Sequence, residues 1–509
     1  MLTEAEQGTP EFWADTRPDA PAVIKGDEVM TYGEWNDRAN RVADALAALG
    51  LEEGDRLGMR FRLSFEWFVI QRALQKLGVG QVAVNWRLTA DEAEYIVRDS
   101  GAKGLACDDV DASPWTKHDL GVLVTVGDNP GHRYEDLLAS GKPIARFGAQ
   151  RPSIVLYTSG TTGAPKGVPP LDFAGVDFER LARYGASLAR AGAPPHDARV
   201  LMSLPVHHGA GAFAATAACA MGGTAVLLDP YDPEEALRLI DEHKIQTWVG
   251  VPTMLLRIQA LPEDVVDRYD LSSMQALTVG AAPVPQSLKQ WIVEHFGNVL
   301  WEGYGTSESG MITYMAPEHQ LTKPGSSGIP YDGVEIAIVD DEWNRLPTGE
   351  DGEIAVNTPV VLRGYLGREP LGDDVLRDGF YRTGDVGHVD EDGFLFITDR
   401  IKDMIVAGGV NIYPAEIEKA LVEHPDVEDA AVIGIPEPDF GEQALAFIVT
   451  RPGHSVTAPQ LLEFLDGRLA TYKKPRQFEF VDALPVSPMG KVLKTELRAP
   501  YWKGHERNV

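Results

Sequence analysis

Short apolar runs alternate with amphipathic segments through most of the chain. Residues 22–24 and 81–84 are runs of strand length, and residues 32–49 place apolar side chains at helical spacing. Further along, Asp232 and Pro233 have the residue types that favour a helix N-cap and a first helical position. Alternating strand and helix patterns are typical of α/β proteins with layered sheets. We therefore predict a large N-terminal domain in which helices cover layered sheets.

The pattern changes in the last third of the chain. Between residues 325 and 399, Gly and Asp recur between short apolar runs, which indicates a region rich in strands and loops. The segment that follows reads as a compact α+β unit, and residues 414–424 are its clearest helix. We place the domain boundary at Asp399. The expected units are residues 1–398 and a small, mobile α+β C-terminal domain, 399–509.

The length and charge of the chain limit the functions to consider. A chain of 509 residues exceeds what one hydrophobic core usually supports, which agrees with two or more domains. The chain has 46 basic and 76 acidic side chains, and its net charge of -30 repels nucleic acid and anionic membrane surfaces. We therefore expect no nucleic-acid partner. Any site for a polyanion must rely on local backbone amides, a few basic side chains and a divalent cation.

The cysteines and the N-terminus favour a cytoplasmic protein. Only Cys107 and Cys219 are present, without the spacing of a redox motif or a zinc site. The acidic N-terminus lacks the regions of a signal peptide. No Asp, Glu, Lys or Arg lies between Arg199 and Asp229, but Pro205 and a Gly-Gly pair interrupt this stretch. We expect a buried loop, an Ala-rich helix and a strand there, not a membrane span.

A loop rich in glycine and threonine follows the apolar run at residues 153–156. Residues 157–167 read Tyr-Thr-Ser-Gly-Thr-Thr-Gly-Ala-Pro-Lys-Gly. Glycine lets the backbone approach phosphate closely, and hydroxyl and amide groups donate hydrogen bonds to a polyanion. The spacing differs from a Walker P-loop, because the lysine follows Pro165 and precedes a glycine. The alternative is an ordinary solvated turn. The candidate phosphate-binding residues are Ser159, Gly160, Thr161, Thr162, Gly163 and Lys166.

Four further segments carry candidate chemistry. Residues 304–308 (Tyr-Gly-Thr-Ser-Glu) and 381–385 (Tyr-Arg-Thr-Gly-Asp) combine an aromatic ring, glycine and a carboxylate, and each alone also fits a surface turn. A charged segment, residues 398–403, precedes a Gly-Gly pair, and residues 485–492 end on Gly-Lys-Val. Together with the loop at 157–167, and in this order, these segments resemble the motifs of the adenylate-forming superfamily. That family contains acyl- and aryl-CoA synthetases, adenylation domains of peptide synthetases and beetle luciferases.

The resemblance implies a nucleotide site. In the family, the residue at the position of Tyr304 lies along the adenine, and the one at Asp385 accepts hydrogen bonds from both ribose hydroxyls. The arginine at position 400, Arg400, is expected to reach the ribose. Glu308 and Thr161 would hold Mg²⁺, for which a carboxylate oxygen is a suitable ligand. The remaining nucleotide-binding candidates are Gly280, Gly305, Thr306 and Ser307, the last in place of the commoner threonine.

The same resemblance assigns the C-terminal residues to two steps of one reaction. Lys491 stands at the position of the catalytic lysine, although Val486 replaces an arginine that is common in that motif. Gly408 and Gly409 correspond to the turn that lines the pantetheine channel of coenzyme A. Because both are needed at one site in different steps, the C-terminal domain must rotate, and Asp399 is the candidate hinge. The catalytic candidates are Lys491, Thr161, Thr162, Lys166 and Glu308.

Residues 203–211 resemble the family segment that faces the acid. The family's histidine falls at His208, and a structural role for the His207 and His208 pair is the alternative. Amino-acid-activating relatives carry an aspartate near this segment, and no acidic residue occurs from Val200 to Leu228, which disfavours a free amino acid. The small residues after His208 leave volume for a bulky aromatic or polycyclic acid, unless the Ala-rich helix only packs closely against a sheet. The acid-binding candidates are His207, His208, Gly209, Ala210, Phe213, Ala281 and Ala282.

These observations predict an ATP-dependent carboxylic acid–CoA ligase. A small-molecule carboxylic acid, ATP and coenzyme A are the expected substrates, and Mg²⁺ is the expected cofactor. The alternatives are an enzyme that loads a carrier protein, a fatty acyl-CoA synthetase, an oxygenase that acts on the acyl-adenylate, and a nucleotide-binding protein without catalysis. A carrier protein or a downstream acyltransferase is the expected protein partner, and the chain is expected to be a monomer or a homodimer.

Overall fold

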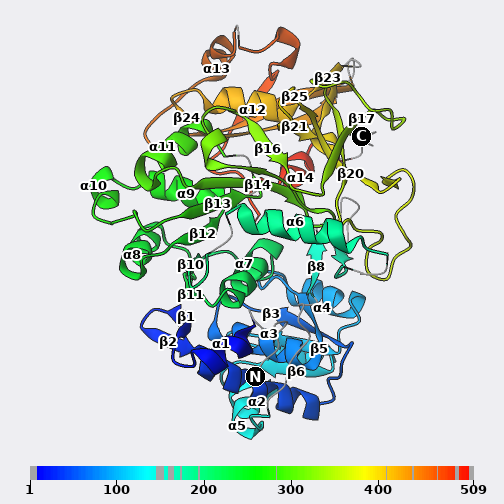
Figure 1. Ribbon diagram of the computed structural model, residues 1–509. Helices are drawn as coiled ribbons and strands as arrows, with labels where there is room; N and C mark the ends of the chain where they lie inside the picture. The colour runs from blue at the N-terminus through cyan, green and yellow to red at the C-terminus, as the bar shows by residue number, and fades with distance from the viewer. Residues whose placement is uncertain are drawn as a thin grey trace.

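The chain folds into three β-sheets with helices packed around them (Figure 1). The computed structural model describes residues 9–144, 154–158, 165–171, 175–192, 195–282, 284–407, 410–437, 441–466, 468–487 and 492–503. Within these residues the N-terminal sheet has seven strands, the central sheet fourteen and the C-terminal sheet five. This mixed architecture, with a large N-terminal domain of sheets and helices and a small C-terminal domain, confirms the predicted α/β fold class.

The N-terminal sheet is parallel except where its last strand turns back. Its strand order is β7-β6-β5-β3-β4-β8-β9, and β8 pairs with β9 in the antiparallel sense. Parallel strands require cover on both faces, which helices connected to them provide. Helix α2 packs against α1, α3 and α5. The strands are β3 (Arg56–Arg60), β4 (Gly80–Ala83), β5 (Gly104–Cys107), β6 (Val122–Thr125), β7 (His132–Arg133), β8 (Ile154–Thr158) and β9 (Lys166–Val168). The helices are α1 (Pro10–Thr16), α2 (Tyr32–Ala48), α3 (Phe65–Leu77), α4 (Ala90–Asp99) and α5 (Tyr134–Ser140).

The central sheet combines a parallel middle with an antiparallel side. Its order is β17-β18-β20-β21-β16-β15-β14-β13-β12-β10-β11-β1-β2, with β19 on β20, and the strands from β14 back to β10 are parallel. Strand β1, from the start of the chain, pairs with β11. The strands are β1 (Pro21–Lys25), β2 (Glu28–Thr31), β10 (Arg199–Met202), β11 (Thr224–Leu227), β12 (Thr247–Gly250), β13 (Ala276–Gly280), β14 (Leu300–Thr306), β15 (Gly310–Met315), β16 (Ser326–Pro330), β17 (Glu335–Val339), β18 (Gly352–Asn357), β19 (Leu376–Arg377), β20 (Phe380–Val389) and β21 (Leu395–Arg400). The helices of this region are α6 (Phe178–Arg190), α7 (Gly209–Ala220), α8 (Pro233–His243), α9 (Pro252–Gln259), α10 (Glu263–Val266) and α11 (Gln286–Phe296).

Helix starts follow the capping chemistry expected from the sequence. Helix α2 follows Thr31, whose hydroxyl accepts a hydrogen bond from the Glu34 amide at 3.2 Å, while the Glu34 carboxylate accepts one from the Thr31 amide at 3.0 Å. Helix α8 begins at Pro233, and the Asp232 carboxylate accepts from the Glu235 amide at 2.9 Å. These bonds satisfy amides that have no partner inside the helix. The predicted N-cap and first helical residue of α8 are therefore confirmed.

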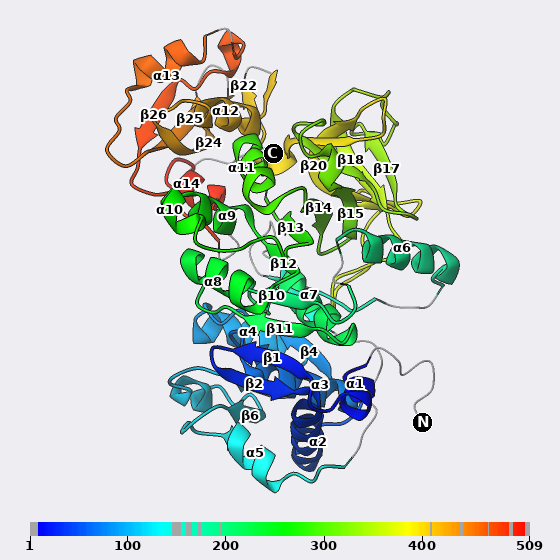
Figure 2. The same cartoon turned by 60° about the vertical axis from the view of Figure 1, so that its left-hand side comes forward.

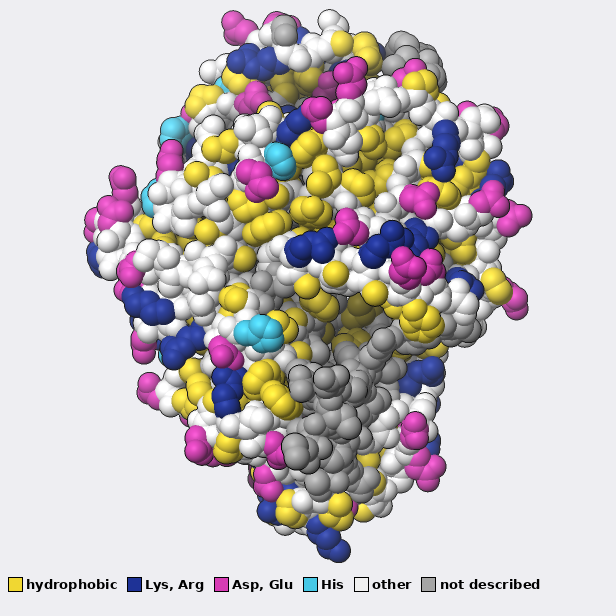
Figure 3. All heavy atoms as spheres, in the orientation of Figure 1, with side chains coloured by type: hydrophobic (Ala, Val, Ile, Leu, Met, Phe, Trp, Pro, Cys, Tyr) yellow, Lys and Arg dark blue, Asp and Glu magenta, His cyan; other side chains and the backbone are white. Residues whose placement is uncertain are grey.

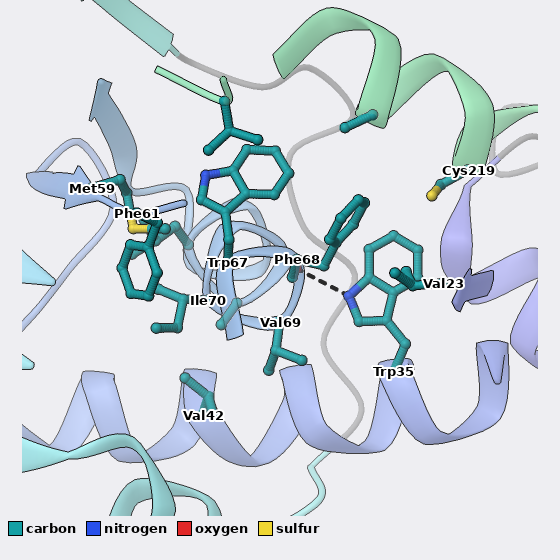
Figure 4. Close-up of a cluster of buried hydrophobic side chains, with 14 of the residues drawn as sticks. Val23, Trp35, Val42, Met59, Phe61, Trp67, Phe68, Val69, Ile70 and Cys219 are labelled. Atoms are coloured by element: carbon teal, nitrogen blue, oxygen red, sulfur yellow. Dashed lines mark hydrogen bonds between the residues drawn. The ribbon is translucent and has the colours of Figure 1, made fainter. Parts of the chain in front are cut away.

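A large apolar cluster ties α7 to the N-terminal helices (Figure 4). The Trp35 indole nitrogen of α2 donates to the Phe68 carbonyl of α3 at 3.0 Å, and Cys219 of α7 faces the same cluster. Ala215 and Ala218 of α7 are fully buried in it. Small side chains on this face of α7 thus serve close packing, as the alternative interpretation of the Ala-rich helix expected.

The C-terminal sheet is built around one long antiparallel pair. Strands β24 and β25 pair from Val427 opposite Thr450 to Glu437 opposite Gly441, and α12 packs on β24. In both cartoon views this sheet lies at the end of the molecule opposite the N-terminal sheet (Figures 1 and 2). The strands are β22 (Ile405–Ala407), β23 (Val410–Ile412), β24 (Val427–Glu437), β25 (Gly441–Thr450) and β26 (Gln477–Phe480). The helices are α12 (Pro414–Val422), α13 (Ala458–Phe464) and α14 (Lys494–Arg498).

The surface mixes charges of both signs. Figure 3 shows acidic side chains spread over one face and interspersed with Lys and Arg, so the net negative charge is not gathered there in one patch. Just below α6 the same face is hollowed, with hydrophobic side chains at the bottom of the hollow. Among the described helices, none is both long enough and apolar enough to cross a membrane.

Candidate active site

One buried carboxylate joins three residues that are far apart in the sequence. Asp385 is only 3% exposed, and its Oδ2 accepts a hydrogen bond from the Tyr304 hydroxyl at 2.6 Å. Its Oδ1 forms an ion pair with the Arg400 Nε at 2.9 Å. Burial, followed by the nearby Asp385 carboxylate, raises the pKa of Tyr304, so the hydroxyl stays a donor. The structure therefore brings together the three residues expected around the ribose and adenine.

The strand register explains why Asp385 and Arg400 lie side by side. Asp385 on β20 lies directly opposite Arg400 on β21, and Gly384, with a φ of +74°, lies within β20 where its register against β18 shifts. On β14, a Cβ at Gly305 would lie 2.3 Å from the Gly310 carbonyl oxygen, so only glycine fits there. Gly305 thus permits a close backbone contact, whereas Gly384 permits a backbone conformation that other residues rarely adopt.

A second cluster surrounds Glu308. Its Oε1 accepts a hydrogen bond from the Tyr365 hydroxyl at 3.1 Å, and its backbone carbonyl accepts one from the Leu362 amide at 2.6 Å. The Lys166 Nζ lies 5.1 Å from the centroid of the Tyr365 ring. One tyrosine therefore contacts both the candidate metal ligand and the candidate phosphate-binding lysine.

The two clusters are neighbours. Burial, then the Glu308 carboxylate and more weakly Asp385, raises the pKa of Tyr381 on β20. Tyr381 is buried, and it also interacts with Tyr365. The candidate ribose carboxylate and the candidate metal carboxylate thus share one apolar and hydroxyl-bearing wall.

Strands β8 and β9 hold the two ends of the glycine-rich loop. Thr158 pairs with Lys166 across this hairpin. Before the loop, the Tyr157 hydroxyl donates to Asp99 Oδ2 at 2.8 Å, and after it the Tyr95 hydroxyl donates to the Pro165 carbonyl at 3.2 Å. Both ends are therefore anchored on α4. The loop's own candidates, Ser159, Gly160, Thr161, Thr162 and Gly163, lie outside the described residues.

The end of β13 supplies a strained turn at the same edge of the sheet. Gly280 lies opposite Gly303 of β14, and a Cβ on it would be 3.0 Å from the Gly303 carbonyl oxygen. Ala281 follows with a φ of +68°, a conformation that costs an L-residue energy and often marks a functional site. The carboxyl ends of parallel strands are the usual place for ligands in open α/β sheets. Ala282 comes next in the same bend. The position of this bend agrees with the prediction that Gly280 binds the nucleotide and that Ala281 and Ala282 bind the acid.

The remaining motif residues on β14 differ in exposure. Thr306 is partly buried, and its hydroxyl accepts a hydrogen bond from the Ser309 amide at 3.1 Å, which shapes the turn before Glu308. Ser307 is exposed at the tip of that turn. Because Ser307 is exposed, its hydroxyl, which replaces the hydroxyl of the commoner threonine, is not needed to form this turn.

The histidine pair is neutral, with His207 buried and His208 half-buried. The ring centroids of His207 and His208 are 4.6 Å apart, and both ring nitrogens of His207 lack a hydrogen-bond partner among the described residues. Burial, and then the neighbouring His208 and Arg87, lowers the pKa of His207 to about 3. Burial and Arg87 lower the pKa of His208 to about 4. Uncharged imidazoles next to an apolar helix suit an uncharged substrate group better than an ammonium.

Helix α7 turns one face toward the outside of the N-terminal cluster. Ala210 and Phe213 are exposed, Phe213 by 67%, and Ala217 is half-buried one helical turn further on. Gly209, at the start of the helix, would bring a Cβ to within 3.0 Å of the Leu156 side chain on β8. The candidate acid wall therefore lies beside the strand that leads into the glycine-rich loop.

Asp399 connects the central sheet to the C-terminal part. Its Oδ1 accepts from the Arg400 amide at 2.7 Å, and its Oδ2 accepts from the Ala415 amide at 2.9 Å, in the first turn of α12. Burial raises the pKa of Asp399 to about 6, although the nearby Lys494 opposes this change. The hinge and the boundary at this residue stay predictions. Gly408, Gly409 and Lys491 lie outside the described residues.

Comparison with known protein families identifies the family to which this chain belongs. Residues 11–366 match the family model described as AMP-binding enzyme, and residues 416–491 match the AMP-binding enzyme C-terminal domain. The chain belongs to the AMP-binding enzyme family. It is an AMP-forming acid–thiol ligase, as the resemblance in the sequence predicted.

The names of individual relatives differ in the acid and in the acceptor of the acyl group. The chain is 34% identical to the fatty acid–[acyl-carrier-protein] ligase ScoC of Streptomyces coeruleorubidus, over 98% of this chain and 97% of that protein. It is 34% identical to a feruloyl-CoA synthase of an Amycolatopsis species, over 94% and 96% of the two chains. A solved structure of the o-succinylbenzoate coenzyme A synthetase of Bacillus subtilis, in complex with ATP and magnesium ion, matches with a TM-score of 0.81 and 30% identity and covers 96% of this chain and 98% of that one.

The residues of this ligase fit a divalent cation. Glu308 is half-buried and offers a carboxylate whose Oε1 is held by Tyr365. Mg²⁺ typically takes one or two protein carboxylates, several waters and the phosphate oxygens of its substrate. A single well-oriented carboxylate beside a phosphate loop meets that requirement.

Sequence reasoning missed the residues that support this site. Tyr365 bonds to Glu308, Asp99 bonds to Tyr157 before the glycine-rich loop, and Tyr381 interacts with the charge of Glu308, but no spacing rule connects these residues with the predicted site. Tyr381 did open one motif, where only the aspartate was assigned a role. The one available signal was the polar and aromatic segment Arg363-Gly-Tyr-Leu-Gly-Arg368 between two strands.

Proposed function

We propose that this ligase activates a bulky ring-containing carboxylic acid and transfers its acyl group to coenzyme A. The observation that carries the choice of acid is the neutral pair at the start of α7, buried His207 and half-buried His208, without an acidic side chain from Val200 to Leu228. Such a wall offers no carboxylate to pair with the charge of an ammonium group. The outward face of α7, with Ala210 and Ala217 beside Phe213, leaves volume for a ring.

The first step joins the acid to the nucleotide. A carboxylate oxygen of the acid attacks the α-phosphorus of ATP, the bond to the bridging oxygen breaks, and pyrophosphate leaves with that electron pair. Asp385 and Arg400 hold the ribose, Tyr304 lies along the adenine, and Lys166 with the loop hydroxyls neutralises the phosphates. Lys491 stabilises the charge that develops on the phosphate oxygens. A bound Mg²⁺, held by Glu308 and Thr161, would add positive charge near the leaving pyrophosphate.

The second step forms the thioester. The sulfur of coenzyme A attacks the acyl carbonyl carbon and gives up its proton to solvent, and the carbon–oxygen bond to AMP breaks, so AMP leaves with that electron pair as the second product. Gly408 and Gly409 would line the passage for the pantetheine chain. Since Lys491 serves the first step, the C-terminal domain must present two faces to one site, and rotation at Asp399 accounts for this.

Loading of a carrier protein is the second candidate function. One relative is named as a fatty acid–[acyl-carrier-protein] ligase, and it matches nearly the whole chain. A carrier protein also presents a pantetheine thiol, so the same two steps would apply. The identity of the thiol, and not the chemistry of the site, separates the two functions.

One assay tests the proposal. Pyrophosphate release is measured with aryl, alicyclic and straight-chain fatty acids, each with and without coenzyme A, and the products are identified by mass spectrometry. We expect the highest kcat/KM for a ring-containing acid and an acyl-CoA product. A clear preference for straight-chain acids would contradict the proposed substrate class. Thioester formation with a carrier protein but not with coenzyme A would favour the second candidate.

A further inference from the structure

The segment at residues 362–368 follows β18 and runs alongside the candidate metal site; we name it the brace segment. It contacts Glu308 twice. The Leu362 amide donates to the Glu308 carbonyl at 2.6 Å, and the Tyr365 hydroxyl donates to Glu308 Oε1 at 3.1 Å. The brace segment therefore fixes both the backbone and the carboxylate of the same residue.

The brace segment also holds the far side of the phosphate site. The Leu366 amide donates to the Gly167 carbonyl on β9 at 2.8 Å. Arg368 donates to Asp99 Oδ1 at 2.8 Å, and the other oxygen of Asp99 accepts the Tyr157 hydroxyl at 2.8 Å. The two strands that flank the glycine-rich loop, β8 and β9, are thus linked to Glu308 through this segment.

Tyr365 is the residue at which these contacts meet. Its hydroxyl binds the negative Glu308 carboxylate, and its ring lies under the positive Lys166, with the Nζ 5.1 Å from the centroid. A cation is attracted to the face of an aromatic ring within about 6 Å. The side chain therefore holds two opposite charges on opposite parts of one rigid group.

The direction of the hydrogen bonds is fixed by chemistry. An ionised carboxylate only accepts, so the single proton of the Tyr365 hydroxyl is donated to Glu308. The hydroxyl therefore fixes the position of the carboxylate oxygen that it contacts.

We propose that Tyr365 is a positioning residue for the metal–nucleotide complex: it orients the Glu308 carboxylate toward the cation and holds Lys166 for the phosphates. The proposal rests on the proposed function only in taking Glu308 as the metal ligand and Lys166 as the phosphate ligand. Tyr365 donates to Oε1 of Glu308, so Oε1 keeps one acceptor position, and Oε2 keeps both of its positions for the cation among the contacts of the described residues. Partners that orient a ligand in this way are worth about 10-fold to 100-fold in metal affinity.

Two substitutions separate the two roles of Tyr365. Tyr365→Phe removes the hydroxyl and keeps the ring, so we expect the metal-dependent part of nucleotide binding to weaken by about 10-fold, at the lower end of that range. Tyr365→Leu removes the ring as well, so binding of the nucleotide without metal should weaken too, because Lys166 loses its support.

The measurement is calorimetric binding of α,β-methylene-ATP, which cannot be cleaved between the α- and β-phosphates. Each protein is titrated in excess Mg²⁺ and again in EDTA, and the ratio of the two dissociation constants gives the coupling between metal and nucleotide. The double variant with Glu308→Gln completes the test, since Tyr365→Phe should add no further loss of coupling once the carboxylate is gone. This readout does not depend on turnover, so failure to release pyrophosphate from any acid would refute the proposed function and leave this test intact.

A matched control uses a second tyrosine–glutamate pair. The Tyr269 hydroxyl donates to Glu234 at 3.1 Å, the same distance, on an exposed part of the surface. Tyr269→Phe should leave the coupling unchanged. Retained coupling in Tyr365→Phe, or an equal additional loss in the Glu308→Gln background, would overturn the proposal, the latter because it would show an effect that does not pass through Glu308.

Discussion

Substitution of Asp385 by Asn tests the ribose site most directly. Each carboxylate oxygen of Asp385 has one protein donor, Tyr304 at 2.6 Å on Oδ2 and Arg400 at 2.9 Å on Oδ1. A carboxylate oxygen can accept two hydrogen bonds, so each oxygen keeps one position for a ribose hydroxyl. Asn replaces one of these oxygens by an NH₂ group, which is itself a donor. One ribose hydroxyl and one protein donor therefore lose their acceptor.

The size of the effect follows from the burial of the carboxylate. A hydrogen bond to a charged group contributes about 1.5 to 3 kcal/mol. Because Asp385 is 3% exposed, water cannot replace the lost acceptor before ATP binds. At about 1.4 kcal/mol for each factor of ten, the loss corresponds to a roughly 10-fold to 150-fold weaker affinity for ATP. Arg400 is 39% exposed and can be solvated, which limits the accompanying loss of folding stability.

The assay compares ATP with 2′-deoxy-ATP on both proteins by isothermal calorimetry. In the native protein the missing hydroxyl should weaken binding. In Asp385→Asn this penalty should shrink, because the acceptor for the hydroxyl has already been lost. An identical deoxy penalty in both proteins would refute the ribose assignment, even if Asp385→Asn binds ATP less tightly, since the two losses would then be independent.

Three further predictions concern the rest of the site. Lys491→Ala should reduce pyrophosphate release by about 100-fold or more while a preformed acyl-adenylate is still converted to thioester, and equal loss of both steps would contradict its role. Ala217→Phe should lower kcat/KM for the largest ring acids first, and uniform tolerance across an acid panel would show that this face of α7 does not meet the substrate. Because the pKa of His207 is lowered to about 3 from 6.5, its contribution to stability should be constant above pH 6.5 and fall by up to about 1.4 kcal/mol for each pH unit below it. Urea unfolding at pH 7.5 and 5.5 should show a smaller difference for His207→Gln, and an unchanged difference would refute this origin.

Local structure was largely predictable from the sequence, because it depends on nearby residues. The helix from Tyr32 and the capped start at Asp232 follow from apolar spacing and from capping chemistry, and both are present. The expected strand at residues 153–156 is β8, which runs instead from Ile154 to Thr158. Its end depends on pairing with β9, a contact that the apolar run does not reveal.

The contacts that build the site were only partly predictable. The resemblance named Tyr304, Asp385 and Arg400 separately, but their mutual bonds depend on the register of β20 and β21 and on the path of β14. The role of Tyr365 could not be predicted from the polar and aromatic segment that contains it, because that role arises from a loop that reaches back over 57 residues to Glu308. Long-range pairing is set by the packing of whole sheets, and a motif records only which residue types are present.

The pairing of β1 with β11 has a consequence for the folding of this chain during its synthesis on the ribosome. Val23 lies beside Ala225, so about 200 further residues must be translated before β1 gains its parallel neighbour. At roughly 5 to 20 residues per second, this wait is on the order of 10 to 40 seconds. A two-stranded hairpin alone is marginal in water, and α2 and α3, made next, can already cover one face of β1. The edge of β1 that pairs with β11 stays open throughout the interval, so this side of the central sheet is completed only after the middle of the chain has been synthesised.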